Sequence, residues 1–185
     1  MKKVALLGDS IRLGGYGPKV PEVLGDEFEV WQPSDNCRFS TYTLRGIFDW
    51  KKDLEGCDVI HWNNGIWDAV DTFGDGPFTP PDMYVFTMKR IAKILFTYSK
   101  HVIFATTTPV NNPDAKRDYE IIKSYNALIV PELEKMGVII NDLHSTVDSN
   151  KDLYICSDTL HLSEEGSRVC AEQVAECIRK AVAED

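Results

Sequence analysis

The sequence has no long hydrophobic run, and no stretch approaches the roughly 18–20 apolar residues of a membrane-spanning helix. It is also short of basic charge, because 20 Lys and Arg stand against 29 Asp and Glu and give a net charge of −9. Binding to nucleic acid or to an anionic membrane requires a basic face. We therefore predict that neither of them is a partner of this protein.

Cysteine pairs are also missing. The five cysteines are an odd number and include no C-x-x-C motif, so neither a disulfide framework nor a zinc site is indicated. Cys57 and Cys170 lie in apolar surroundings and are expected to pack as small hydrophobic residues. His61 and His144 are isolated, and we expect no metal and no cofactor. Because the first apolar strand begins near residue 4, we expect no signal peptide and a reducing, cytoplasmic location.

The length of 185 residues and the absence of linkers or repeats predict one domain, residues 1–185. Short apolar runs predict strands at 4–7, 28–31, 57–63, 101–106 and 137–142. Amphipathic patterns predict helices that start near Pro18, at 41–52, at 84–99, at 117–135 and after a cap at Ser163. This alternation predicts a three-layer α/β/α, flavodoxin-like fold with a five-stranded parallel sheet in the order 2-1-3-4-5. Residues 66–82 are expected to form a long loop at the rim of the site, and residues 143–162 a polar loop.

Polar residues with catalytic potential follow the predicted strands. Ser10 comes directly after the first strand, where it could be a nucleophile or only a helix cap. Asp158 and His161 are three residues apart before the last helix. A carboxylate in this position can accept a hydrogen bond from one imidazole nitrogen and leave the other facing a nucleophile. Alternatively, Asp158 caps a turn and His161 is a packed surface residue.

Three motifs give the chain a family resemblance. Gly8-Asp9-Ser10-Ile11, Asn63-x-Gly65 and Asp158-x-x-His161 resemble, in order and over the whole chain, the SGNH (GDSL-type) hydrolase superfamily. The resemblance implies that Ser10 is the nucleophile of an acyl-enzyme mechanism, with His161 as general base and acid and Asp158 as its orienting residue. It also implies an oxyanion hole built from the Ser10 N–H, a second backbone N–H and an asparagine side chain.

The second block of the family usually supplies a glycine N–H, whereas this chain has Asn36-Cys37-Arg38-Phe39-Ser40. A non-glycine N–H can donate equally well, and we predict that Cys37 or Arg38 supplies it. The Arg38 side chain is also a candidate for binding a substrate carboxylate or phosphate, although a solvated surface arginine fits equally well.

The third block usually reads Gly-x-Asn-Asp, whereas this chain has Gly65-Ile66-Trp67-Asp68. Asn63 is predicted to replace the missing amide, because at the strand end it points along the same face as Ser10. Asn64 would point to the opposite face if the strand extends that far. Trp67 is then a candidate for the pocket wall that binds substrate, although a lone aromatic residue also fits the core.

Together these features predict a serine ester hydrolase acting on a small ester. Deacetylation of a carbohydrate fits, and short acyl esters and lysolipids fit nearly as well. A flavodoxin-like binding module for a nucleotide or flavin would need a phosphate-binding turn where this chain has Asp9-Ser10 and the bulky Ile11-Arg12. A degenerate SGNH-fold module that binds a glycan or another small ligand without hydrolysing it is the remaining alternative. The sequence does not indicate an oligomeric state.

Overall fold

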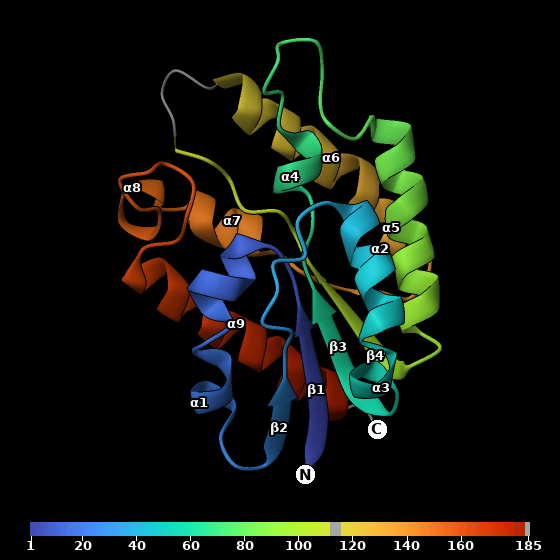
Figure 1. Cartoon of the computed structure of the whole chain (residues 1–185). Coiled ribbons are helices and arrows are strands. Elements are labelled where there is room, and N and C mark those ends of the chain that lie inside the picture. The colour runs from blue at the N-terminus through green and yellow to red at the C-terminus, as the bar shows by residue number, and fades with distance from the viewer. Residues whose placement is uncertain (112–115, 184–185) are drawn as a thin grey trace.

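A computed structural model describes residues 1–111 and 116–183. It contains a parallel sheet of five strands in the order β2-β1-β3-β4-β5 (Figure 1). The strands are β1 (Lys2–Leu7), β2 (Phe28–Trp31), β3 (Cys57–Trp62), β4 (Ser99–Ala105) and β5 (Ile139–Asn141). The structure therefore confirms the predicted sheet and its strand order.

Helices cover both faces of the sheet because neighbouring strand residues point to opposite sides. Leu7 belongs to a core with α2 (Ser40–Asp49), α3 (Lys51–Leu54), α5 (Pro81–Leu95) and α6 (Lys116–Glu134). Leu6 belongs to a second core with η1 (Ile11–Tyr16), α1 (Val20–Leu24), α7 (Leu143–Asp148) and α9 (Glu164–Ala183). The result is the predicted three-layer α/β/α arrangement (Figure 1). None of the helices in the described ranges is long and apolar enough to cross a membrane.

Several element boundaries differ from the sequence-based predictions. The helix predicted at 41–52 is divided at Trp50 into α2 and α3. The predicted long loop at 66–82 contains a short helix, α4 (Ile66–Ala69), and ends where Pro81 starts α5. The helix predicted to continue to Ser99 ends at Leu95, because Ser99 begins β4 and pairs with Cys57.

The prediction of a polar loop at 143–162 was wrong, because this segment contains α7 and α8 (Lys151–Tyr154). Leu143 and Val147 are both buried and are four residues apart, so they lie on one face of a helical turn. The Asp142 side chain caps α7 by accepting the Ser145 N–H at 3.1 Å. Two apolar residues within a polar segment were too weak a pattern to predict this helix.

The beginning of α9 agrees with the prediction. The Ser163 Oγ accepts the Gly166 N–H at 3.0 Å, which is the expected N-terminal cap. Gly166 approaches the preceding α8 so closely that a Cβ there would lie 2.1 Å from the Tyr154 carbonyl oxygen. The cap and this close approach fix α9 directly after residues 156–163, the segment that carries Asp158 and His161.

The carboxyl ends of the central strands meet at one edge of the sheet. Leu7, the last residue of β1, pairs with Trp62, the last residue of β3. Ser10 and Asn63–Gly65 therefore follow neighbouring strands at the same edge. This is the position at which parallel α/β sheets place their ligands.

Candidate active site

Ser10 stands at the start of η1, immediately after β1. The Asp9 carbonyl accepts the N–H groups of Arg12 at 3.1 Å and Leu13 at 2.9 Å, which starts the helical turn. The Ser10 side chain makes no capping hydrogen bond to this turn. Its Oγ lies instead 3.0 Å from Nε2 of His161, 151 residues later in the chain. The hydroxyl is thus turned away from its own helix and toward residues 156–163.

Asp158 holds His161 in a tight turn. Its Oδ1 accepts the N–H groups of Leu160 at 3.0 Å and of His161 at 2.9 Å, and its Oδ2 lies 2.7 Å from His161 Nδ1. These hydrogen bonds, that of the Leu160 N–H above all, lower the pKa of Asp158 to about 2. The carboxyl group is therefore ionised at neutral pH and can only accept hydrogen bonds. The imidazole must carry its proton on Nδ1, which leaves the Nε2 lone pair facing Ser10.

The structure thus brings Ser10, His161 and Asp158 into one continuous line of hydrogen bonds. In this order of groups, the imidazole can remove the proton of the hydroxyl as the hydroxyl oxygen attacks a substrate, while the carboxylate orients the imidazole. Asp158 also caps its turn. It therefore makes both contacts that the sequence left open as alternatives, one to the turn and one to the imidazole of His161. The His161 side chain is 44% exposed, which leaves access from solvent to the serine–histidine contact.

Asn63 lies behind the nucleophile turn. Its Nδ2 donates to Asp9 Oδ1 at 2.9 Å, and its Oδ1 accepts the Tyr16 hydroxyl at 2.9 Å. A Cβ on Gly8 would lie 1.9 Å from Asn63 Oδ1, so this orientation of the amide requires a glycine at position 8. The amide is therefore held in one orientation, and no residue of the described chain accepts its second N–H.

The second block does not offer the N–H groups that the sequence led us to predict. The Cys37 N–H donates to the Gly8 carbonyl at 3.1 Å, and the Arg38 N–H donates to Asn36 Oδ1 at 2.8 Å. Both groups are engaged within the protein, so our prediction that Cys37 or Arg38 supplies the oxyanion donor needs correction. The first hydrogen bond is a tertiary contact and the second is local to the loop, and the sequence pattern reveals neither.

Phe39 is the residue of this block whose N–H stays free among the described residues. On one side of it, Arg38 takes a left-handed conformation with φ of 45°, and its carbonyl accepts Asn64 Nδ2 at 3.0 Å. On the other side, the Ser40 N–H and hydroxyl donate to the buried Asp68 carboxylate at 2.9 and 2.7 Å. The peptide between Arg38 and Phe39 is therefore clamped from both sides.

The two predicted substrate-binding side chains have neighbours of their own. The Arg38 guanidinium lies over the ring of Tyr42 at 5.1 Å. Trp67 packs edge to face on Phe39 at 5.4 Å, and Phe39 contacts Phe78 at 5.5 Å. Trp67 thus belongs to an aromatic cluster with Phe39 and Phe78. It is absent from the lining of the two hollows described next.

Two hollows flank residues 158–162. One, of about 280 Å³, includes Ser10 and His161 in its lining. The other, of about 250 Å³, is mostly aliphatic and includes Asp158 but neither Ser10 nor His161. Only the first of the two therefore reaches the reacting atoms.

Asp9 is fully buried beside the nucleophile, and burial raises its pKa from 3.8 to about 6, with opposing effects from Asn63, Ile11 and Arg12. Between these two values the native state binds more protons than the unfolded state, so the free energy of unfolding falls as pH rises toward 6. Asp9→Asn, which is neutral at every pH, removes this dependence. We expect the free energy of unfolding of the variant, relative to that of wild type, to rise by about 2 kcal/mol between pH 4 and pH 7, measured by urea unfolding. A difference that stays constant over this range would contradict the burial of an ionisable carboxyl group.

Three residues of the site were not predicted from the sequence. Asp68 ends the third block, where the family pattern ends in Asp, so its position offered a signal that we did not use. Tyr16 and Phe39 offered no such signal. Tyr16 contributes through its hydroxyl contact with Asn63, and Phe39 through its free N–H, and neither can be read from the residue type.

The described residues contain no group of three or more His, Cys, Asp or Glu side chains arranged to hold a metal ion. His61 is buried in β3, where its Nε2 accepts from Asn141 Nδ2 at 3.2 Å, and burial lowers its pKa to about 3. His144 Nδ1 donates to the Thr107 carbonyl at 2.8 Å. Each histidine thus uses one ring nitrogen in a hydrogen bond within the protein, while Nδ1 of His61 is buried without a partner in the described chain.

Comparison with known proteins finds one curated relative and several solved structures of the same fold. No family model matches it. A curated relative, the GDSL esterase/lipase WDL1 of Oryza sativa subsp. japonica, is 27% identical over 193 residues, which cover 91% of this chain and 72% of the relative. Two solved structures have the same fold. One is a lipase/acylhydrolase from Enterococcus faecalis (TM-score 0.77, 17% identity, 97% and 96% of the two chains covered). The other is a catalytic mutant of an acetylxylan esterase from Geobacillus stearothermophilus (TM-score 0.78, 17% identity, 96% and 94% covered).

Proposed function

This chain shares its fold and its order of motifs with the SGNH (GDSL-type) hydrolase superfamily, and on that premise we propose that it is a serine ester hydrolase with an acyl-enzyme mechanism. One observation carries the proposal: Ser10 Oγ lies 3.0 Å from His161 Nε2, while His161 Nδ1 lies 2.7 Å from the ionised Asp158. The names of the similar proteins support the same reaction class.

In the proposed reaction, Ser10 Oγ attacks the acyl carbonyl carbon, and His161 Nε2 takes the hydroxyl proton. The tetrahedral intermediate collapses when the bond to the leaving oxygen breaks, and His161 returns the proton to that oxygen. Water then attacks the acyl-enzyme in the same way and releases the acid and free Ser10. Asp158 stays ionised throughout and stabilises the imidazolium that forms in each step.

We assign the oxyanion to three donors: the Ser10 N–H, the Phe39 N–H and the second N–H of the Asn63 amide. Phe39 replaces Cys37 and Arg38 in this proposal, because the N–H groups of those two residues are engaged elsewhere. The orientation of Asn63 by Asp9 and Tyr16 supports its assignment, because a donor that is already oriented loses little entropy in the transition state.

The proposed substrate is a small ester, with the acetyl ester of a carbohydrate as the leading candidate. The acetylxylan esterase fold neighbour and the aromatic cluster of Phe39, Trp67 and the exposed Phe78 support this choice. We propose a reducing, cytoplasmic location, supported by five cysteines that are all free. The alternative of a degenerate glycan-binding module is not favoured, since Ser10, His161 and Asp158 are all in hydrogen-bond contact.

A hydrolysis panel tests the proposal. Wild type and Ser10→Ala would be compared on acetylated xylo-oligosaccharides, p-nitrophenyl esters of two to eight acyl carbons and a lysolipid. We expect hydrolysis of acetyl esters by wild type that is lost in Ser10→Ala. Wild type that hydrolyses none of these esters would refute the ester hydrolase proposal. A preference for the long acyl chains would refute only the proposal that the substrate is an acetyl ester of a carbohydrate.

A further inference from the structure

The hollow of about 280 Å³ beside the nucleophile has a lining with little charge. It is lined by Ser10, Leu13, Gly14, Gly15, His161 and Leu162. Apart from His161, none of these side chains is ionisable. The hollow therefore suits an uncharged group of limited size that sits next to the serine–histidine contact.

The floor of this hollow is a widened turn of η1. The Gly17 N–H donates to the Arg12 carbonyl at 2.9 Å, five residues earlier, which is the spacing of a π-type turn. Gly15 departs from helical geometry, with φ of −104° and ψ of −108°. At the exposed Gly14 a Cβ would meet no heavy atom within 4 Å. Gly14 and Gly15 thus contribute only backbone to the lining beside Leu13, and a side chain at position 14 would enter open space.

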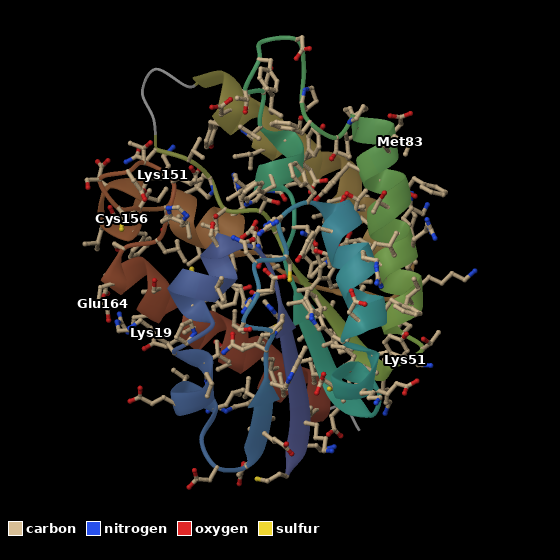
Figure 2. All side chains as sticks on the ribbon, viewed as in Figure 1. Lys19, Lys51, Met83, Lys151, Cys156 and Glu164 are labelled. Atoms are coloured by element: carbon tan, nitrogen blue, oxygen red, sulfur yellow. The ribbon has the colours of Figure 1, made fainter. Side chains whose placement is uncertain are left out.

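The two walls of the hollow are fixed relative to one another. The buried Arg12 guanidinium anchors η1 through hydrogen bonds to the carbonyls of Gly8 at 3.1 Å and Asp35 at 2.7 Å. An ion pair between Lys19 and Glu164 joins the segment after η1 to the start of α9 (Figure 2). The hollow therefore lies between two segments that hydrogen bonds and an ion pair connect to the rest of the fold.

The lining shows which part of an ester the hollow faces. His161 has to return its proton to the leaving oxygen, so that oxygen must come within hydrogen-bond reach of Nε2. The lining contains Ser10 and His161 but no residue of 36–40 or 63–65. Those two segments carry the proposed oxyanion donors other than the Ser10 N–H. We therefore expect the group attached to the leaving oxygen to extend into this hollow and the carbonyl oxygen to point toward those donors.

We propose that this hollow binds the alcohol part of the ester and that Gly14 sets the size of alcohol that it accepts. The proposal rests on the proposed ester hydrolase function. It makes Gly14 a specificity-determining residue, although its side chain takes no part in the chemistry.

Gly14→Leu tests this assignment directly. The new side chain enters open space at a position with helical geometry, so the fold should accommodate it. We expect kcat/KM for 2-naphthyl acetate to fall roughly tenfold or more relative to that for methyl acetate. Deacylation should stay unchanged, because every acetate ester gives the same acetyl-enzyme after its alcohol has left. Burst-phase kinetics with p-nitrophenyl acetate separate the two steps, with a slower burst and an unchanged steady phase expected.

Two further variants complete the test. Leu13→Ala enlarges the hollow and should shift the preference in the opposite direction, toward the bulky alcohol. Lys93→Leu places a leucine on the exposed face of α5, outside the lining of either hollow. This variant should keep the wild-type kcat/KM for both acetates.

The outcomes separate this proposal from the function on which it rests. If Gly14→Leu slows deacylation, or changes the acyl-chain preference at a fixed alcohol, the hollow binds the acyl part and the assignment is overturned. If folded Gly14→Leu has the wild-type kcat/KM for both acetates, the hollow is not a substrate site. Failure of the ester hydrolase proposal would appear differently, as wild type that hydrolyses none of these esters.

Discussion

Replacing Ser10 with alanine is expected to lower kcat for p-nitrophenyl acetate by roughly 10⁵–10⁶-fold. The change removes the atom that forms the acyl bond, and His161 then has no hydroxyl from which to take a proton. Oxyanion donors and substrate binding would remain, so a residual rate above that of water is expected. The free energy of unfolding should change little, because Ser10 Oγ makes no capping bond and its contact in the structure is His161.

Ser145→Ala is the matched control. Ser145 also stands at a helix start, where its hydroxyl donates to Asp142 Oδ2 at 2.6 Å, and it lines neither of the two hollows beside the proposed triad. This variant should retain wild-type kcat. A Ser10→Ala protein that is folded and hydrolyses esters within about tenfold of wild type would rule out Ser10 as the nucleophile.

Asp158→Asn is expected to lower kcat by about 10⁴-fold although the side chain keeps its shape. The backbone N–H groups of Leu160 and His161 both point at one carboxylate oxygen, so the asparagine must turn its carbonyl oxygen toward them. Its NH₂ group then faces His161 Nδ1, and the imidazole has to carry its proton on Nε2. In that tautomer the imidazole cannot accept the proton of Ser10.

Asp158→Ala separates this tautomer effect from a purely steric one. If the carboxylate only holds the ring in place, Asn should retain most of the activity and Ala should lose it. The structure predicts that Asn is no more active than Ala at pH 7, measured as kcat on p-nitrophenyl acetate with folding checked by circular dichroism. An asparagine variant close to wild type would contradict the assigned protonation of His161.

The sheet order and the position of Ser10 at its edge were predictable from the sequence because both depend on local patterns. Short apolar runs alternate with amphipathic segments, and only right-handed crossovers connect parallel strands. Ser10 and His161 are far apart in sequence, yet both directly adjoin elements that the pattern places well. Their contact therefore followed from topology together with the family motifs.

The remaining donors of the site could not be predicted, because they depend on which backbone groups other residues occupy. Cys37 and Arg38 were plausible from their position, but Gly8 and Asn36 accept their N–H groups. The left-handed Arg38 and the clamp of Asn64 on its carbonyl arise from tertiary packing, which a pattern of residue types does not contain. The single domain, by contrast, stays a prediction.

The central claim is that Ser10 is a nucleophile activated by His161, and covalent labelling tests it most directly. The protein would be treated with a fluorophosphonate, which loses fluoride when a serine oxygen attacks phosphorus, and the modified residue located by peptide mass spectrometry. The structure predicts one phosphonyl group per chain, on Ser10, and none in Ser10→Ala. An adduct on another residue, or an unlabelled protein that still hydrolyses esters, would contradict the account.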